Sequence, residues 1–159
     1  GPRKKAIRVI ENGRQRILRD NYTGIVEEIN TDLLTTLLGA GYFPVLTPPA
    51  VSFEGEAINV DGDRAAAATA AALGAQQLVV LSNVPGVLGS FPDEASLISR
   101  ISRGELEDAA QRYAEGRMRI KLLAAGEALK AGVRQVIIGD SRREHPIREA
   151  LEGCGTVIE

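Results

Sequence analysis

The sequence contains no tryptophan, one cysteine and one histidine in 159 residues. A single cysteine, Cys154, excludes an internal disulfide, and with His145 it offers too few soft ligands for a zinc site. We therefore expect no metal held by the protein alone and a reducing, cytoplasmic setting. Cys154 is expected to pack in the core, and His145 to lie on the surface at a helix start.

Long apolar runs are also lacking. No stretch approaches the roughly 20 apolar residues that a membrane-spanning helix requires. The amino terminus does not show the charged and then apolar pattern of a signal peptide. These absences favour a soluble protein with no membrane partner. The 44% apolar content is enough to build one core of ordinary size, so no second globular domain is expected.

The net charge of -2 hides an uneven distribution. Residues 1–19 hold seven cations and one anion, whereas the rest of the chain holds 12 of the 19 cations and 20 of the 21 anions. Two β-prone runs, 6–10 and 15–19, flank Asn12-Gly13, a pair that supplies the positive φ angles of a tight hairpin turn. Residues 1–20 are therefore predicted to form a basic β-hairpin extension, and residues 21–159 the main domain.

After residue 30, helix and strand patterns alternate. A helix capped at 30–32 carries leucines at helical spacing, and a short strand is predicted at 42–46. The remaining predicted elements are helices at 64–73, 120–131 and 146–152 and strands at 77–81, 135–138 and 155–158. This alternation predicts an α/β fold, a three-layer α/β/α sandwich around a mainly parallel sheet.

Ligands of such sheets bind beyond the carboxyl ends of the strands. The loops expected there are 59–63, 82–89 and 139–143, together with the approach to Ile120. Two glycine-rich phosphate fingerprints are absent: G-x-G-x-x-G after a strand, and G-x-x-x-x-G-K followed by Ser or Thr. Their absence disfavours a dinucleotide-dependent dehydrogenase and a P-loop enzyme.

Four segments carry a resemblance to a known family. They are Ile58-Asn59-Val60-Asp61-Gly62-Asp63, Leu81-Ser82-Asn83-Val84-Pro85-Gly86-Val87-Leu88, Gly116-Arg117-Met118-Arg119-Ile120-Lys121 and Gly153-Cys154-Gly155-Thr156-Val157-Ile158. In this order they resemble successive signatures of the amino acid kinase family, and within it the chain is most similar to the N-acetylglutamate kinase branch. The resemblance covers nearly the whole chain but only about the second half of such a kinase. The family's amino-terminal lysine and its glycine-rich loops are outside it.

The resemblance implies that ATP, with Mg²⁺, phosphorylates a carboxylate to give an acyl phosphate. A carboxylate with a pKa of about 4 is already ionised at neutral pH, so no general base is required. The demand is to bring two anions together and to neutralise the charge that develops on the transferred group. By match to the family, Lys121 would stabilise that charge. Asp63 would hold Lys121, and a second lysine from outside this chain, in position. Asn59 would bind the substrate. The residues implied to line the nucleotide are Asn83, Val84, Pro85, Gly86, Val87 and Leu88.

Departures from the acetylglutamate kinase pattern point to a particular branch. Asp61 and Gly62 stand where Asn and Ala are usual, and Asn83 stands where Asp is usual. With the basic hairpin, the chain resembles kinases that act on an aminoadipate or glutamate residue at the carboxyl end of a small acidic amino-group carrier protein, in lysine or arginine biosynthesis. Cations beside the site would steer such a carrier. Those assigned to carrier binding are Lys4, Lys5, Arg8, Arg14 and Arg16, and a homodimer is expected for the full enzyme.

Plainer interpretations stand beside these. Asp63 at a helix start can simply favour the helix dipole, Lys121 alone is typical of a solvated helix residue, and Asn83 before Pro85-Gly86 is also typical of a turn. The hairpin can be a solubilising ribbon or a weak nucleic-acid contact, although its apolar residues are not aromatic, which argues against single-stranded nucleic acid. The alternative functions are an N-acetylglutamate kinase of arginine biosynthesis and a module that binds nucleotide or carrier without turnover.

Overall fold

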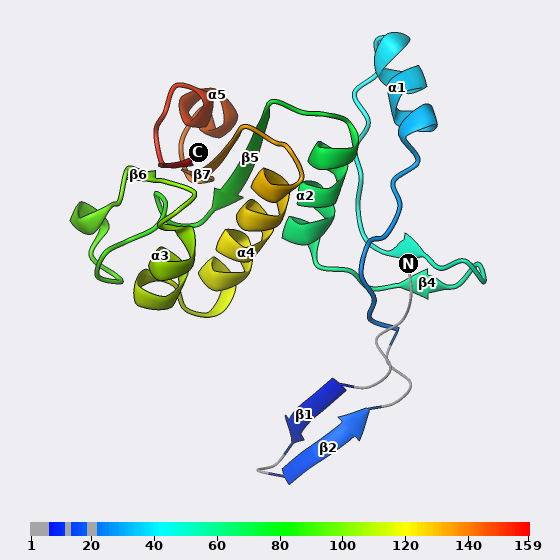
Figure 1. Cartoon of the computed structure of the whole chain (residues 1–159), viewed down its shortest axis with the longest axis horizontal. Coiled ribbons are helices and arrows are strands. Elements are labelled where there is room, and N and C mark those ends of the chain that lie inside the picture. The colour runs from blue at the N-terminus through cyan, green and yellow to red at the C-terminus, as the bar shows by residue number, and fades with distance from the viewer. Residues whose placement is uncertain (1–6, 12–13, 19–21) are drawn as a thin grey trace. The chain divides into compact units, whose positions relative to one another are not determined.

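The computed structural model describes residues 7–11, 14–18 and 22–159. The chain divides into two compact units, Gly1–Ala65 and Ala66–Glu159, and each is described by itself. Figure 1 follows the elements in chain order from the blue amino-terminal strands to the red carboxyl-terminal strand.

The first unit begins with two antiparallel strands, β1 (Ile7–Glu11) and β2 (Arg14–Leu18). Ile7 lies opposite Leu18, and Glu11 opposite Arg14. The predicted pair of strands is therefore confirmed, with each boundary displaced by one residue. The predicted turn at Asn12-Gly13 lies outside the described residues.

Helix α1 (Thr31–Gly39) forms where the leucine spacing predicts it, and the Asn30 side chain caps it by accepting a hydrogen bond from the Leu33 N–H at 3.0 Å. The strand predicted at 42–46 is wrong. This segment is not in a ladder with any described strand, and Phe43 and Val45 are 92% and 90% exposed. β-prone residues form a strand only where a neighbouring strand satisfies their backbone groups.

The start of the segment Ile58–Asp63, the first of the four family-like segments, is held by backbone pairing in the first unit. Strands β3 (Ala50–Val51) and β4 (Ala57–Ile58) pair antiparallel. Directly after β4, the Asn59 N–H donates to the Tyr22 carbonyl at 2.6 Å, and the Asn59 carbonyl accepts from the Gly24 N–H at 2.9 Å. The backbone of Asn59 is thus fixed on both sides.

Helix α2 (Gly62–Ala72) starts immediately after this pairing and continues into the second unit. The Asp61 carboxylate accepts a hydrogen bond from the Arg64 N–H at 2.9 Å, the bond expected of a helix cap. Asp61 therefore caps the helix, and Asp63 lies in its first turn.

The second unit is built on a four-stranded sheet in the order β5-β7-β8-β6. β5 and β7 are parallel, β6 and β8 are parallel, and β7 and β8 are antiparallel. The elements of this unit are β5 (Gln77–Ser82), the 3₁₀ helix η1 (Glu94–Ser96), β6 (Arg100–Ile101), α3 (Leu106–Tyr113), α4 (Gly116–Lys130), β7 (Gln135–Asp140), α5 (Pro146–Leu151) and β8 (Thr156–Ile158).

The antiparallel step lies between β7 and β8. β7 ends at Asp140, and the chain passes through a turn and the six-residue helix α5 before β8 begins at Thr156. The chain re-enters the sheet at the carboxyl end of β7, so β8 runs against it.

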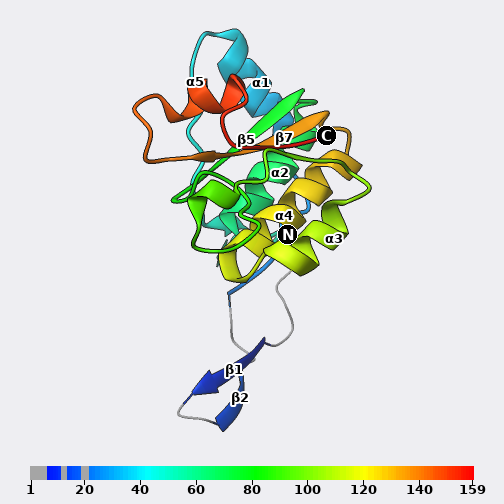
Figure 2. The ribbon, with the colours of Figure 1, turned by 90° about the vertical axis from the view of Figure 1, so that its left-hand side faces the viewer.

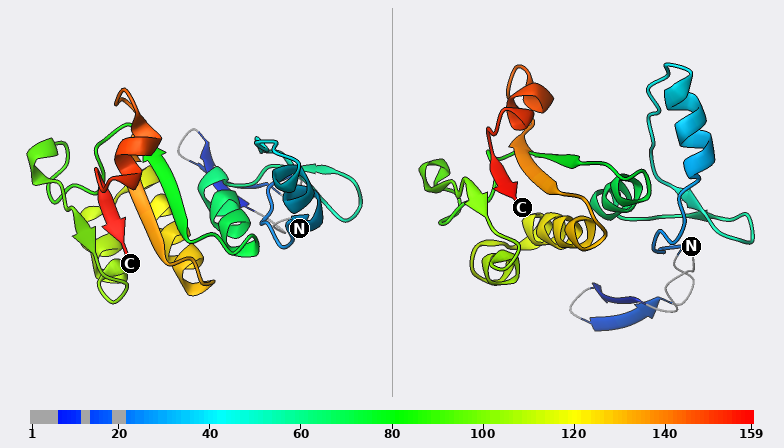
Figure 3. Two further views of the ribbon diagram at one scale, coloured as in Figure 1. Left: turned by 90° about the horizontal axis from the view of Figure 1, so that it is seen from above. Right: turned by 45° about the horizontal axis from the view of Figure 1, so that its top comes forward.

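Helices cover both faces of this sheet, which confirms the three-layer prediction. Figure 2 shows α5 on one side of β5 and β7, with α3 and α4 on the other, and the right-hand view of Figure 3 shows the same layers. Val136 and Ile138 pack with Leu122 in the larger core cluster, whereas Ile137 packs with Ala150 on the α5 side. Side chains that alternate between two buried faces explain the continuous apolar run of β7.

Two further details differ from the sequence predictions. Helix α4 begins at Gly116, four residues before the predicted start at Ile120. Cys154 is exposed and not in the core, because it lies in a turn between Gly153 and Gly155, whose φ angles are 93° and 140°. His145 is exposed beside the first residue of α5, as predicted.

Among the described helices, none combines the length and apolar character needed to cross a membrane.

Candidate functional site

Three strand ends of the second unit meet at one edge of the sheet. Ser82 at the end of β5 lies opposite Asp140 at the end of β7, and the Ser141 N–H donates to the Ser82 carbonyl at 2.7 Å. Because β8 is antiparallel to β7, its first residue, Thr156, lies near the same edge, opposite Ile138. Ligands of α/β sheets bind at this kind of edge.

The loop after β5 folds back along this edge through its own hydrogen bonds. The Ile98 N–H donates to the Val87 carbonyl at 2.9 Å, and the Gly89 N–H donates to the Ser96 carbonyl at 2.8 Å. Gly86, Val87 and Leu88 are buried, whereas Asn83 is exposed and Val84 and Pro85 are half-buried. Of the residues implied to line a nucleotide, Asn83 to Pro85 therefore have the solvent-accessible side chains.

A single buried side chain fixes the buried half of this loop to β8. The Thr156 hydroxyl accepts a hydrogen bond from the Val87 N–H at 2.8 Å and donates one to the Ile98 carbonyl at 2.7 Å. A Cβ atom on Gly86 would lie 2.5 Å from the Thr156 hydroxyl oxygen and 2.9 Å from the Thr156 nitrogen. The loop backbone and β8 are thus in direct contact, at a distance that only glycine permits.

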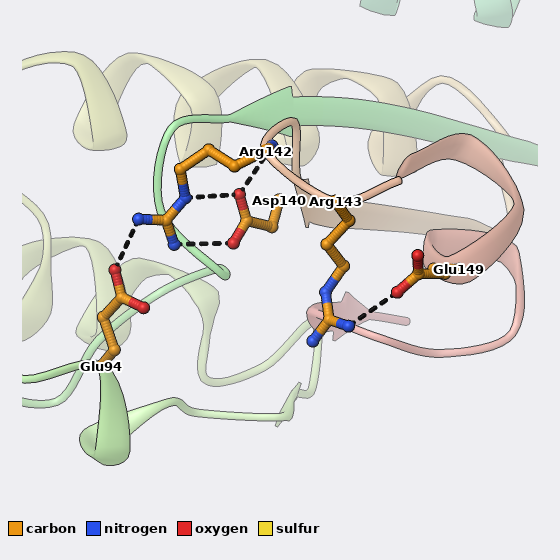
Figure 4. A network of polar contacts seen from close by, with 5 residues as sticks. All are labelled: Glu94, Asp140, Arg142, Arg143 and Glu149. Carbon is orange, nitrogen blue, oxygen red and sulfur yellow. Dashed lines mark hydrogen bonds and ion pairs between the residues drawn. The ribbon is translucent and has the colours of Figure 1, made fainter. Parts of the chain in front are cut away.

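A charged network holds the far part of the same loop (Figure 4). Arg142 donates from Nε and Nη2 to the two carboxylate oxygens of Asp140 at 2.8 and 2.7 Å. Its Nη1 is paired with Glu94 of η1 at 2.8 Å. Arg142 therefore connects the end of β7 to a loop element that is distant in sequence, and the bidentate geometry fixes its orientation.

The charges in this network shift one another's pKa. The pKa of the Asp140 carboxyl is lowered chiefly by the hydrogen bonds from Arg142, and burial opposes that shift. The pKa of Arg142 is raised by its hydrogen bonds to Asp140 and then to Glu94. The ion pair accordingly stays charged at neutral pH, and it has the role of a structural brace and not of a proton donor or acceptor.

A second pair lies in the adjoining turn (Figure 4). Arg143 donates to a Glu149 carboxylate oxygen at 2.6 Å, and the pKa of Glu149 is lowered chiefly by this hydrogen bond. Sequence reasoning selected the loop 139–143 but gave these side chains no role. The available signal was the position of Asp140 at the end of a buried strand, two and three residues before Arg142 and Arg143.

Helix α4 directs its amino end toward the same edge. It packs on β7 and is joined to it by a short turn from Lys130 to Gln135, so the two elements run in opposite directions. Lys121, in the second turn of α4, is half-buried and lies toward the carboxyl end of β7. The structure thus places Lys121 in the same unit and toward the same edge as the loop 83–88.

The other predicted site residues belong to the first unit. Asn59 is exposed directly after β4, and Asp63 is half-buried in the first turn of α2. Of the cations predicted to bind a carrier, Arg8 is in β1 and Arg14 and Arg16 are in β2. Lys4 and Lys5 lie outside the described residues.

A separate groove of about 670 Å³ lies between α3 and α4. Its apolar lining includes Leu106, Ala110 and Leu123, and Arg103 and Lys130 are among its charged residues. At the amino end of α4, Gly116, Arg119 and Ile120 also line it. Lys121 and the loop 83–88 are not among its lining residues.

Comparison with known proteins shows the family of this chain. The model of the amino acid kinase family matches residues 3–140. The chain belongs to the amino acid kinase family. The predicted resemblance is therefore confirmed at the family level.

Individual relatives extend the comparison. A LysW-aminoadipate kinase of Thermus thermophilus is 53% identical over 159 residues, which are 99% of this chain and 59% of the relative. An acetylglutamate kinase of Archaeoglobus fulgidus is 37% identical, over 99% of this chain and 56% of the relative. The chain thus spans less than two thirds of the length of these curated relatives.

A solved structure supports the fold. The N-acetylglutamate synthase of Neisseria gonorrhoeae, in complex with coenzyme A and L-arginine, superposes with a TM-score of 0.76 at 29% identity. The superposition covers 99% of this chain and 36% of that protein. The α/β arrangement of this chain therefore recurs in an N-acetylglutamate synthase.

The Arg142 brace gives a first prediction. Replacement of Arg142 by Gln should lower the midpoint of thermal unfolding by roughly 3–8 °C, because the buried carboxylate of Asp140 loses its charged partner. Arg148→Gln is the matched control, since the Arg148–Glu152 pair is exposed and should contribute almost nothing. Differential scanning calorimetry at neutral pH measures both variants.

The pH dependence of the same variants separates the brace from a general packing defect. Because the folded-state pKa of Asp140 is lowered, its stabilisation is present above the ordinary aspartate pKa of about 3.9 and is lost as the pH falls through the lowered value. The difference in unfolding midpoint between the unaltered chain and Arg142→Gln should therefore become smaller as the pH is lowered through this range. An equal difference at every pH would contradict the assignment of Arg142 and Asp140 as a charged brace.

Proposed function

We propose that this chain supplies the nucleotide-binding part of a kinase that phosphorylates the side-chain carboxylate of 2-aminoadipate carried by an acidic amino-group carrier protein. The observation that carries the proposal is the 53% identity to a relative named LysW-aminoadipate kinase, against 37% to a relative named acetylglutamate kinase. Glutamate on the same kind of carrier is the neighbouring substrate, since it differs from aminoadipate by one methylene. An N-acetylglutamate kinase is the second candidate, favoured by the relative from Archaeoglobus fulgidus.

The proposed chemistry needs charge neutralisation and alignment. The acceptor carboxylate is already a nucleophile at neutral pH, so the protein has only to bring it to a second anion and to stabilise the transferred group. We assign the second task to Lys121, and we propose that Asp63 positions this ammonium group. Asn59 donates a hydrogen bond to the substrate in this scheme. These roles are supported by the family motif and by the direction of α4.

ATP is the proposed phosphoryl donor, with Asn83, Val84 and Pro85 presented to it and Gly86, Val87 and Leu88 forming the buried base of the loop. Within the described ranges, no three His, Cys, Asp or Glu side chains gather as a metal site. Mg²⁺ usually binds through substrate phosphates and few carboxylates, so its proposed place is with ATP. When bound, it neutralises phosphate charge, and no step is assigned to a protein ligand of the metal.

The proposed carrier contact uses the amino-terminal cations. Residues 1–19 hold seven cations, and the positions proposed to contact the carrier are Lys4, Lys5, Arg8, Arg14 and Arg16. An acidic carrier would be steered by such a cluster, and the association rate would fall with added salt. The proposed setting is lysine or arginine biosynthesis in the cytoplasm, with a homodimer as the assembly of the full enzyme.

The substrate assignment is tested by a comparison of acceptors. The complete natural polypeptide that contains this sequence is assayed for ADP release with carrier-bound aminoadipate, carrier-bound glutamate, free aminoadipate and acetylglutamate. Turnover should require a carrier-bound acceptor, and kcat/KM for it should fall steeply from low to high salt.

Other outcomes reorder the candidates. Strong turnover of acetylglutamate with none of the carrier adducts would make the chain part of an acetylglutamate kinase. Binding of an ATP analogue or of the carrier, with no ADP released in the presence of any acceptor, would favour the interpretation as a binding module without turnover. A salt-independent kcat/KM for the carrier adduct would remove the assigned cations from the carrier contact.

The role of Lys121 gives a further prediction. Lys121→Ala should lower kcat by about 10² to 10³, because one preorganised cation is removed from the transferred phosphoryl group. Lys130→Ala is the matched control, since Lys130 is an exposed residue at the end of the same helix. An unchanged kcat in Lys121→Ala, or an equal loss in Lys130→Ala, would exclude the assigned role.

A further inference from the structure

The loop after β5 has two parts with different surroundings. Asn83, Val84 and Pro85 reach solvent, whereas the next three residues are buried and Val87 is 0% exposed. A loop that presents side chains to a ligand must be held on its other side, because an unfixed loop loses part of the binding free energy when it becomes ordered. The contacts of the buried part therefore decide how well the exposed part is preorganised.

The contact that holds the buried part is the hydroxyl of Thr156. This oxygen is used twice, as the acceptor for the Val87 N–H at 2.8 Å and as the donor to the Ile98 carbonyl at 2.7 Å. It thereby joins the start and the end of the loop to β8. The residue is 0% exposed, so water cannot replace the hydroxyl without a rearrangement.

The packing of Gly86 shows independently that this contact is close. A Cβ atom at Gly86 would lie 2.8 Å from Leu97 Cδ1, in addition to its short distances to Thr156. The backbone of the loop therefore lies directly against Thr156 and Leu97, with no space for a side chain at position 86.

We infer that Thr156 is a positioning residue that sets nucleotide affinity through the loop 83–88, without touching the nucleotide itself. This inference rests on the proposed function, since it takes ATP to be the ligand of that loop. Residues that contact the nucleotide give affinity directly, whereas Thr156 acts by keeping the Gly86-Val87 backbone in the conformation that presents Asn83 to Pro85. A methyl group has the size of the hydroxyl but makes neither hydrogen bond.

The test compares three variants of this chain. Thr156→Val removes both hydrogen bonds and keeps the side-chain shape, Thr156→Ser keeps the hydroxyl, and Val157→Ala removes core volume on the α5 side, away from the loop. The dissociation constant for a non-hydrolysable ATP analogue is measured by calorimetry, well below the unfolding temperature of each protein. Thermal unfolding is measured in parallel.

Thr156→Val should weaken analogue binding by about tenfold, the loss expected when a buried hydrogen bond is left unmade. Thr156→Ser should bind within a factor of about two of the unaltered chain, which is roughly 0.4 kcal/mol. Val157→Ala should be less stable but bind normally. Normal binding by Thr156→Val, an equal loss in Val157→Ala, or a loss in Thr156→Ser as large as in Thr156→Val would each overturn the inference.

Amide hydrogen exchange distinguishes failure of the inference from failure of the proposed function. In Thr156→Val the Val87 amide should lose protection while the Ile137 amide in the centre of β7 keeps it. If the unaltered chain binds no nucleotide, the proposed function and the affinity role of Thr156 both fall. If it binds nucleotide and Val87 keeps its protection in Thr156→Val, the inference alone is overturned.

Discussion

The hydroxyl of Thr156 is the contact on which the geometry of the sheet edge depends. It is buried at the first residue of β8 and satisfies one backbone donor and one backbone acceptor of the loop that follows β5. Without it, Val87 would carry an unpaired N–H in the core, a penalty of about 1–3 kcal/mol. The antiparallel direction of β8 makes this contact possible, because it places Thr156 near the carboxyl end of β7, beside the loop.

The Asp140–Arg142–Glu94 network also fixes the loop after β5 to the sheet, but it does so through charged groups. Thr156 fixes the loop near its beginning and end, and Arg142 fixes η1 within it to the end of β7. The two devices differ in their exposure: the hydroxyl is sealed from water, while Arg142 is partly solvated. We therefore expect the hydroxyl to control the local conformation and the ion pairs to add a smaller, pH-dependent contribution.

Much of this architecture could be predicted from the sequence, and the exceptions have physical causes. The run of apolar residues in β7 and the spacing of leucines in α1 report on burial directly, so both elements were predicted correctly. The segment 42–46 has the same β-prone composition, but strand formation depends on a neighbour that its own sequence does not specify. Cys154 was misplaced because composition favours burial, while two positive φ angles beside it place it in an exposed turn.

The candidate site likewise contains residues that could be selected from the sequence and residues that could not. Motif spacing selected Asn59, Asp63, Lys121 and the loop 83–88 as candidates, because a family signature is a local pattern. It did not assign Thr156 or Arg142, since their partners lie 69 residues away at Val87 and, for Arg142, in η1. Contacts of this kind become visible only when the strand order is known. Local pattern thus identified the groups proposed to act on the ligand, and topology identified the groups that hold them.

The central claim is that the carboxyl edge of this sheet is a nucleotide site. The most direct measurement is a titration of the isotope-labelled chain with a non-hydrolysable ATP analogue and Mg²⁺, followed by backbone amide chemical shifts. The account predicts saturable shifts in Asn83 to Leu88 and in the turn after Asp140, with little change between α3 and α4. Shifts confined to the α3–α4 groove, or no saturable shift at the sheet edge, would contradict it.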